Sequence, residues 1–279
     1  RADSIPIIAI TGQVNTSQIG TDAFQEADTF GLSFPITKHS IMVKNAQELL
    51  SAIPQAFEIA LSGRPGPILI DVPKNVQIEQ IEIDDNYFDS SRTFSSDKEV
   101  KFHSSKQEIS ESVLEIINLL KTAKKPVLFC GGGCNTEDGS KSIQKFLSAY
   151  KIPVVTSLMG LGSVPSTDEC FIGMLGMHGS YAANVAIHDC DLVIAAGVRF
   201  DDRATGAVSE FCPNAKLIHI DIDAAEIDKI ISSSVSIVAD VESVFAILAE
   251  LVLENKVTSP DSWMKEIIRL KKDGESMIA

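Results

Sequence analysis

The sequence predicts an α/β protein: a doubly wound, mostly parallel sheet preceded by part of a second α/β domain. Short runs rich in Val, Ile and Leu alternate with amphipathic helical patterns, which is the order of βαβ units. Polar and glycine-rich residues follow several of these runs, at the sheet edge where open parallel sheets bind ligands. The 279 residues, 44% of them hydrophobic, suffice for two separate cores.

The chain is predicted to contain four segments. Residues 1–85 are expected to be the C-terminal part of a first domain, because a buried-strand pattern begins almost at Arg1 and needs partner strands on both sides. Residues 86–105 lose apolar periodicity and are predicted to be a linker. Residues 106–258 carry a complete strand–helix alternation, and 259–279 form a charged helical linker. We therefore expect an excised piece of a longer protein.

The first domain is predicted to open with a strand at residues 5–10. A loop rich in Gly, Thr and Gln follows and leads into a short helix, for which Thr21 or Asp22 is the expected N-cap.

An amphipathic helix is predicted at residues 45–61, with Asn45 as its cap. Pro54 contradicts this helix mildly and is expected to kink it or to shift its start. A strand at 68–73 follows and places Lys74 just past its end. The predicted buried face of the helix comprises Leu49, Ile53, Ala56, Phe57 and Ala60.

The second domain repeats the same alternation. Helices are predicted near 106–123, 137–150, 181–188 and 242–255, and strands at 127–130, 154–156, 192–196, 217–222 and 235–238.

Composition narrows the class of partner. A net charge of −14 argues against nucleic acid or an anionic membrane surface. No run of about 18 apolar residues predicts a membrane span. The five cysteines include no Cys-x-x-Cys pair, so we expect buried thiols in a reducing compartment, the cytosol or an organelle stroma or matrix, and no metal site.

The most polar strand end follows residues 192–196. Arg199 and Arg203 lie four residues apart and can donate forked hydrogen bonds to phosphate or to a polar ring edge. Asp201 and Asp202 can orient these arginines or accept from ribose hydroxyls. A surface turn with local salt bridges is the alternative.

The other strand ends are also unusual. The three glycines at 131–133 do not fit Gly-x-Gly-x-x-Gly, so a standard dinucleotide fingerprint is absent. Each of these ends has a plain structural reading as a turn or as core packing, but together they predict a groove for an extended, phosphate-bearing aromatic cofactor. The remaining ends are 156–162, 173–180, Asp221 with Asp223, and Asp240.

Seven motifs together resemble the catalytic large subunit of the acetohydroxyacid (acetolactate) synthase family. They are TGQV at 11–14, IGTDAFQE at 19–26, SGRPGP at 62–67, GGG at 131–133, LMGLG at 158–162, MLGMHG at 174–179 and GVRFDDR at 197–203.

The resemblance implies a thiamine-diphosphate- and Mg²⁺-dependent enzyme that condenses two 2-oxo acids with loss of CO2, in branched-chain amino-acid synthesis. Residues 1–85 would end its pyrimidine-binding domain, 106–258 would be a Rossmann-like central domain with a mainly structural FAD, and 259–279 would lead to its pyrophosphate-binding domain. The enzyme would form a homodimer or tetramer and bind a small regulatory subunit.

The resemblance also assigns residues. Gln25, Phe24 and Lys74 would face the reaction centre, with Arg203 near the second 2-oxo acid. The flavin groove would comprise Arg64, Gly131, Gly132, Gly133, Ser157, Leu158, Met159, Met177, His178, Gly197, Arg199, Asp201, Arg203, Asp221, Ile222, Asp240 and Val241.

One residue departs from the family pattern, and alternative protein classes remain open. Asn15 stands where the family usually has Pro, which puts inhibitor sensitivity in doubt. The activating glutamate and the metal motif of the family are expected outside this sequence, so the piece alone is expected to be inactive. The alternatives are a related thiamine-diphosphate carboligase or decarboxylase, a nucleotide-binding module such as an electron-transfer flavoprotein or an NAD-dependent deacetylase, and a regulatory protein with a decayed groove; a deacetylase would need zinc-binding cysteines.

Overall fold

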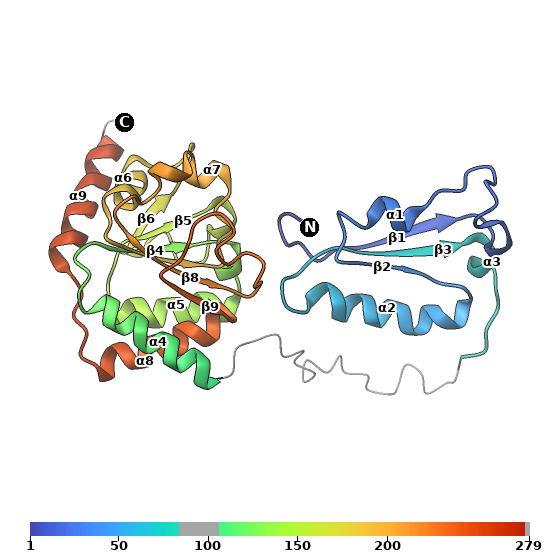
Figure 1. Cartoon of the computed structure of the whole chain (residues 1–279), viewed down its shortest axis with the longest axis horizontal. Helices are drawn as coiled ribbons and strands as arrows, with labels where there is room; N and C mark the ends of the chain where they lie inside the picture. The colour runs from blue at the N-terminus through green and yellow to red at the C-terminus, as the bar shows by residue number, and fades with distance from the viewer. Residues whose placement is uncertain (84–105, 277–279) are drawn as a thin grey trace. The chain divides into compact units, whose positions relative to one another are not determined.

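The computed structural model describes residues 1–83 and 106–276 (Figure 1). The chain divides into two compact units, residues 1–101 and 102–279, and each is described here by itself. The linker expected at 86–105 lies outside the described residues.

The first unit contains a three-stranded parallel sheet with the order β1-β3-β2. The long helix α2 lies along one face of this sheet, and the short α1 lies on the other side of it (Figure 1). The elements are β1 (Ile8–Gln13), η1 (Thr16–Gln18), α1 (Thr29–Ser33), β2 (His39–Met42), α2 (Ala46–Leu61), β3 (Ile68–Pro73) and α3 (Lys74–Gln77).

The start of the first unit differs from the sequence prediction. The first strand begins three residues later than expected, and among the described residues it pairs only with β3, so its second edge has no partner strand. The predicted cap was wrong as well, because α1 is capped by Asp28, whose side chain accepts from the Gly31 N–H. Asp22 instead adopts a positive φ of 58°, which suits a turn.

Helix α2 confirms the predicted span and its Asn45 cap, whose side chain accepts from the Glu48 N–H. Pro54 lies inside the helix without ending it. The predicted face was wrong at Ile53 and Phe57, which are 40% and 47% exposed. Small side chains let the helix lie close to the sheet, and the buried positions are Ala46, Ala52, Ala56 and Ala60.

The second unit contains six parallel strands in the order β6-β5-β4-β7-β8-β9. Numbered along the unit, this is the 3-2-1-4-5-6 order of doubly wound folds, so the predicted fold class is confirmed. The elements are α4 (Lys106–Leu120), β4 (Pro126–Cys130), η3 (Gly132–Cys134), α5 (Glu137–Ala149), β5 (Val154–Thr156), η4 (Leu158–Gly160), β6 (Phe171–Met174), α6 (Tyr181–Asp189), β7 (Leu192–Ala196), α7 (Asp202–Thr205), η5 (Val208–Glu210), β8 (Lys216–Asp221), β9 (Val235–Val238), α8 (Val241–Glu254) and α9 (Asp261–Ser276).

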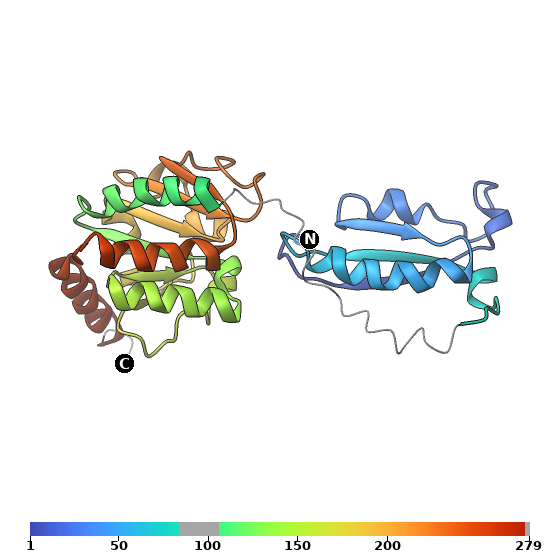
Figure 2. The same ribbon diagram turned by 90° about the horizontal axis from the view of Figure 1, so that it is seen from below.

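Alternate residues of each strand build two cores, one on each face of the sheet. Leu128 and Ile194 join the core beneath α4, α5 and α8, whereas Phe129 and Ala195 join the core beneath α6 and α9. Seen from the first of these helical layers, α8 lies between α4 and α5 (Figure 2). Burial on both faces explains why these strands read as continuous apolar runs.

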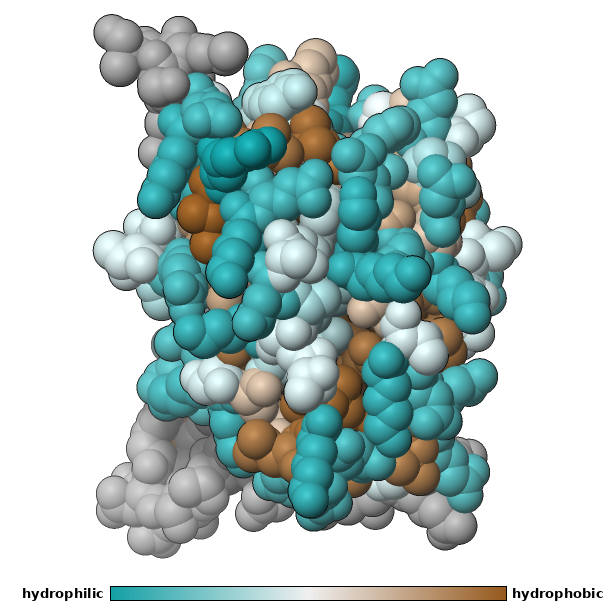
Figure 3. All heavy atoms as spheres, turned by 90° about the vertical axis from the view of Figure 1, so that its left-hand side faces the viewer, coloured by the Kyte–Doolittle hydropathy of each residue, from teal (hydrophilic) through white to brown (hydrophobic). Residues whose placement is uncertain are grey.

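Helix α9 packs onto the second unit. Trp263 is 2% exposed, and its indole N–H donates to the carbonyl of Pro126, 3.1 Å away. The face of the molecule shown in Figure 3 is covered mainly by hydrophilic side chains, with hydrophobic atoms between them. All five cysteines are buried free thiols, as the sequence predicted.

Candidate functional site at the carboxyl edge of the second sheet

The site is built where the strand order reverses. Strands β4 and β7 are neighbours in the sheet, although six other elements of the fold, η3, α5, β5, η4, β6 and α6, separate them along the chain. Doubly wound sheets bind ligands outside the carboxyl ends of the strands at this reversal. The glycine run 131–133 follows β4 and the polar segment 197–203 follows β7, so the fold brings the two most unusual strand ends together.

The glycines join these two strand ends. A Cβ atom on Gly131 would lie 2.0 Å from the carbonyl oxygen of Gly197, and one on Gly133 would lie 2.8 Å from the Gly197 Cα. Gly197 itself has a φ of +57°. Gly131 is buried, whereas Gly132 and Gly133 are exposed. Gly131 and Gly133 serve the close approach to Gly197, and a Cβ on Gly132 would meet only Met159, at 3.2 Å.

The loop after β5 packs against the carboxyl end of β4. A Cβ on Gly160 would lie 2.2 Å from the Cys130 carbonyl oxygen. Ser157 caps η4 by accepting from the Gly160 N–H. Leu158 and Met159 remain 69% and 44% exposed on this loop, a high exposure for apolar side chains.

The loop after β6 closes on the segment after β7. Gly176 has a φ of +101°, and a Cβ there would lie 2.1 Å from the carbonyl oxygen of Arg203. The Met177 N–H donates to that same oxygen at 3.1 Å. The Met177 side chain is 62% exposed, and His178 is exposed as well.

The segment after β7 carries the charges. Asp201 caps α7 by accepting from the N–H groups of Arg203 and Ala204. The Arg203 side chain is 75% exposed, and its Nε lies 3.9 Å from the Asp202 carboxylate. Because this ion pair is exposed, it contributes little to stability. Arg199 is half-buried.

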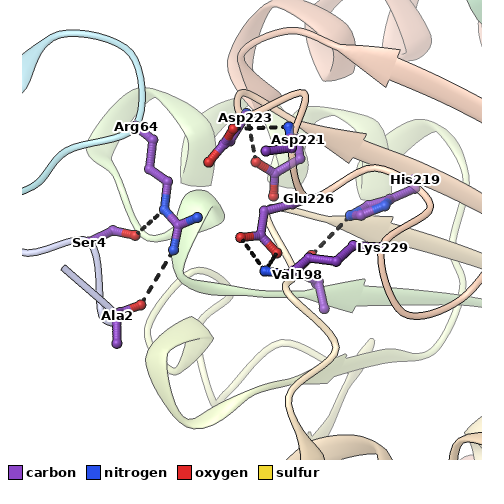
Figure 4. A network of polar contacts seen from close by, with 10 residues as sticks. Ala2, Ser4, Arg64, Val198, His219, Asp221, Asp223, Glu226 and Lys229 are labelled. Atoms are coloured by element: carbon purple, nitrogen blue, oxygen red, sulfur yellow. Dashed lines mark hydrogen bonds and ion pairs between the residues drawn. The ribbon is translucent and has the colours of Figure 1, made fainter. Parts of the chain in front are cut away.

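The ends of β8 and β9 add two carboxylates. Asp221 is 6% exposed and accepts from the Asp223 N–H at 2.9 Å, and Ile222 beside it is half-buried. Asp240 caps α8 by accepting from the Glu242 N–H, whereas Val241 is buried in the core. Figure 4 shows Asp221 and Asp223 beside the loop that follows β8.

The same loop holds an ion pair between the buried Glu226 and Lys229, whose side chain is 54% exposed. Glu226 is 6% exposed, and Lys229, three residues later, donates to its two carboxylate oxygens at 3.1 and 3.2 Å (Figure 4).

Four predicted site residues belong to the first unit. Phe24, 89% exposed, and Gln25, with a φ of +65°, lie between η1 and α1, and Lys74 begins α3. Among the described residues no hydrogen bond or ion pair joins Lys74 to either of them. The Arg64 Nε donates to the Ser4 hydroxyl at 2.9 Å (Figure 4).

Sequence reasoning missed a polar cluster in the first unit. The Asp71 carboxylate is 1% exposed on β3 and accepts from the side chains of Thr11, Gln13 and Thr29. Its only sequence signal is an acidic residue inside an apolar strand, which requires partners.

Metal and membrane features were searched within residues 1–83 and 106–276. In these ranges no group of three or more His, Cys, Asp or Glu side chains could hold a metal ion. No helix within them has the length and the apolar character needed to cross a bilayer.

Comparison with known families identifies the class of protein. Residues 113–251 match the family model described as the central domain of thiamine pyrophosphate enzymes. The second unit therefore contains the central domain of a thiamine pyrophosphate enzyme.

The relatives are more specific, and they confirm the resemblance found in the motifs. The chain is homologous to acetolactate synthase large subunits: it is 41% identical to that of Haemophilus influenzae over 272 residues, which are 96% of this chain and 46% of the relative. It is 42% identical to that of Porphyra purpurea, over 97% of this chain and 45% of the relative. It is 44% identical to the large subunit of acetolactate synthase isozyme 1 of Escherichia coli K12, over 90% of this chain and 43% of the relative. The chain thus spans somewhat less than half the length of these relatives.

Proposed function

We propose that this chain is part of an acetolactate synthase large subunit, which joins two 2-oxo acids, pyruvate with pyruvate or with 2-oxobutanoate, and releases CO2. Identities of 41–44% over 90–97% of the chain support this proposal. Thiamine diphosphate with Mg²⁺, a homodimeric or tetrameric assembly and a small regulatory subunit belong to the same proposal.

The second unit is proposed to bind FAD along the carboxyl edge of its sheet. The observation that carries this proposal is the convergence of four strand-end loops, after β4, β5, β6 and β7, on one edge. These loops expose Leu158, Met159 and Met177, whose apolar side chains suit a flat aromatic ring.

The polar groups of the edge suit the rest of such a molecule. Arg199 and Arg203 can pair with phosphate oxygens, and the first amide groups of η3 and η4 lie on the same edge. Asp221, at the carboxyl end of β8, offers a carboxylate that can accept from ribose hydroxyls. FAD would supply a flavin that the net reaction does not consume, so its proposed role here is structural.

The first unit is proposed to present Phe24, Gln25 and Lys74 to the reaction centre. All three are exposed and follow the carboxyl ends of β1 and β3 in sequence. Arg203 is proposed to help capture the second 2-oxo acid, for which its exposed guanidinium is suited.

Titration of the full chain with FAD, followed by flavin fluorescence and visible absorption, tests the proposal. We expect saturable binding with a changed flavin spectrum, and no comparable binding of NAD. The same titration is made with the variant Arg199→Ala and with its matched control, Lys216→Ala. Lys216 begins β8, so its replacement removes one positive charge at the opposite edge of the same sheet. A chain that is folded but binds no FAD would refute the proposed site.

A further inference from the structure

His219 is a buried imidazole in the middle of β8. It is 0% exposed and pairs with Ala195 of β7 and Ser236 of β9. Its Nε2 lies 2.9 Å from the carbonyl oxygen of Val198. A carbonyl oxygen only accepts, so Nε2 carries the hydrogen and donates it. Figure 4 shows this bond from β8 to the segment that follows β7.

The imidazole is held in its neutral form. Its Nδ1 is buried without a hydrogen-bond partner among the described residues, so a proton there would be unpaired. Burial lowers the pKa of His219, while the Val198 carbonyl and the carboxylates of Asp228 and Glu226 act in the opposite direction. Donation through Nε2 then needs no charge on the ring.

The same ring contacts Phe200. Their centroids are 5.0 Å apart in an edge-to-face arrangement, and Phe200 also packs against Phe129 and Phe211 at 6.2 and 5.9 Å. Phe200 has a φ of +52°, which is uncommon for a bulky residue and persists only where the surroundings enforce it. The aromatic contacts and the bond to Val198 provide that enforcement.

These anchors determine which side chains the segment presents. Val198 and Phe200 are each 3% exposed and point into the core. Arg199, between them, is half-buried, and Asp201, after them, is exposed. Because Val198 and Phe200 are held in the core, the points at which Arg199 and Asp201 emerge from the core are held as well.

We propose that His219 is a positioning residue that holds the segment 197–206 in the conformation that presents Arg199, Asp201 and Arg203 at the carboxyl edge. Its consequence for ligand binding rests on the proposed FAD site, but the positioning itself does not.

Three variants of the full chain test the proposal. His219→Leu removes the donor and keeps an apolar side chain, whereas His219→Gln offers an amide N–H in its place. Ile218→Val is the matched control, because it trims a buried side chain of the same strand on the opposite face of the sheet.

Hydrogen exchange with mass spectrometry reads out the segment directly. The N–H groups of Ala204 and Thr205 donate to Asp201, and that of Gly206 donates to Asp202. In His219→Leu we expect these amides to exchange about tenfold faster relative to the amides of β7. In His219→Gln they should lie within about threefold of the wild type, and Ile218→Val should cause no selective change.

Equal exchange in His219→Leu and the wild type, failure of Gln to restore protection, or the same change in the Ile218 control would each overturn the proposal. FAD titration of the same proteins measures the consequence, with an expected weakening of about tenfold in Kd for His219→Leu. A wild-type chain that binds no FAD would refute the FAD site, and the exchange result would still decide the role of His219.

Discussion

Replacing Gly131 by Ala tests whether the loops at the carboxyl edge are interlocked. Gly131 has extended backbone angles, φ −98° and ψ −167°, so alanine brings no backbone strain. Its Cβ would lie 2.0 Å from the Gly197 carbonyl oxygen, about 1.4 Å inside ordinary contact, and 2.9 Å from the Val198 Cα. Backbone, rather than a flexible side chain, has to move.

The expected cost is that of overpacking with a backbone shift, about 3 kcal/mol of unfolding free energy. With an m-value of about 2 kcal/mol per M urea, the unfolding midpoint would fall by about 1.5 M. Trp263 is the only tryptophan of the chain and is buried in the second unit, so its fluorescence reports that unit alone.

Gly132→Ala is the matched control, because the adjacent glycine is exposed and its nearest neighbour would be the Met159 Cβ at 3.2 Å. This change should alter stability by less than about 1 kcal/mol. Equal midpoints for the two variants would refute the interlocked packing of the strand ends.

Four further predictions concern ligand binding, catalysis, local stability and pH. Arg199→Ala should weaken FAD binding ten- to hundredfold, because charge-assisted bonds contribute about 1.5–3 kcal/mol; unchanged flavin titration would place Arg199 outside the site. In a complete subunit, Arg203→Ala should raise the KM for the second 2-oxo acid more than the Kd for FAD. Normal steady-state kinetics of this variant would show that Arg203 takes no part in capturing that acid. Residues 1–80 should exchange amide hydrogens faster than 106–255, because the first unit has a sheet of three strands and exposes Ile10, Phe34 and other large apolar side chains. Equal protection in a monomer would contradict this. Because burial lowers the pKa of His219, the unfolded chain binds more protons than the folded chain just below pH 6.5, so the stability of the second unit should fall as the pH drops from there. The urea midpoints at pH 7 and pH 5.5 should therefore differ more in the wild type than in His219→Gln. An identical pH dependence of the two proteins would argue against the lowered pKa.

Strand positions in the second unit could be predicted because its sheet is buried on both faces. The bounds of β5, β7 and β9 coincide with the apolar runs expected at 154–156, 192–196 and 235–238. Strand β6 was not predicted: it contains Gly173 with a φ of +145°, and its register against β5 shifts at Val154 and Val155. A short strand of this kind leaves no run for a periodicity argument.

The candidate site could be predicted only in outline. Parallel strands place their carboxyl ends on one edge, so the gathering of Gly131, Ser157 and Arg199 followed from the fold class. The close contact of Gly131 with Gly197 depends on loop conformations that no sequence pattern specifies. His219 is one polar residue in an apolar strand, and its bond to Val198 depends on the path of the chain after the neighbouring strand.

The bond between Trp263 and Pro126 has a consequence for synthesis of the chain on the ribosome. It joins residues 137 positions apart, linking the last helix of the second unit to the first strand. Since β4 is an inner strand and the α9 side chains Trp263 and Ile267 cover its core, the nascent unit keeps an apolar face open until α9 has emerged. Contacts that span so much sequence form late and slowly. A newly made chain is therefore expected to depend on chaperones until α9 is translated, and a pause just before α9 should prolong that exposure.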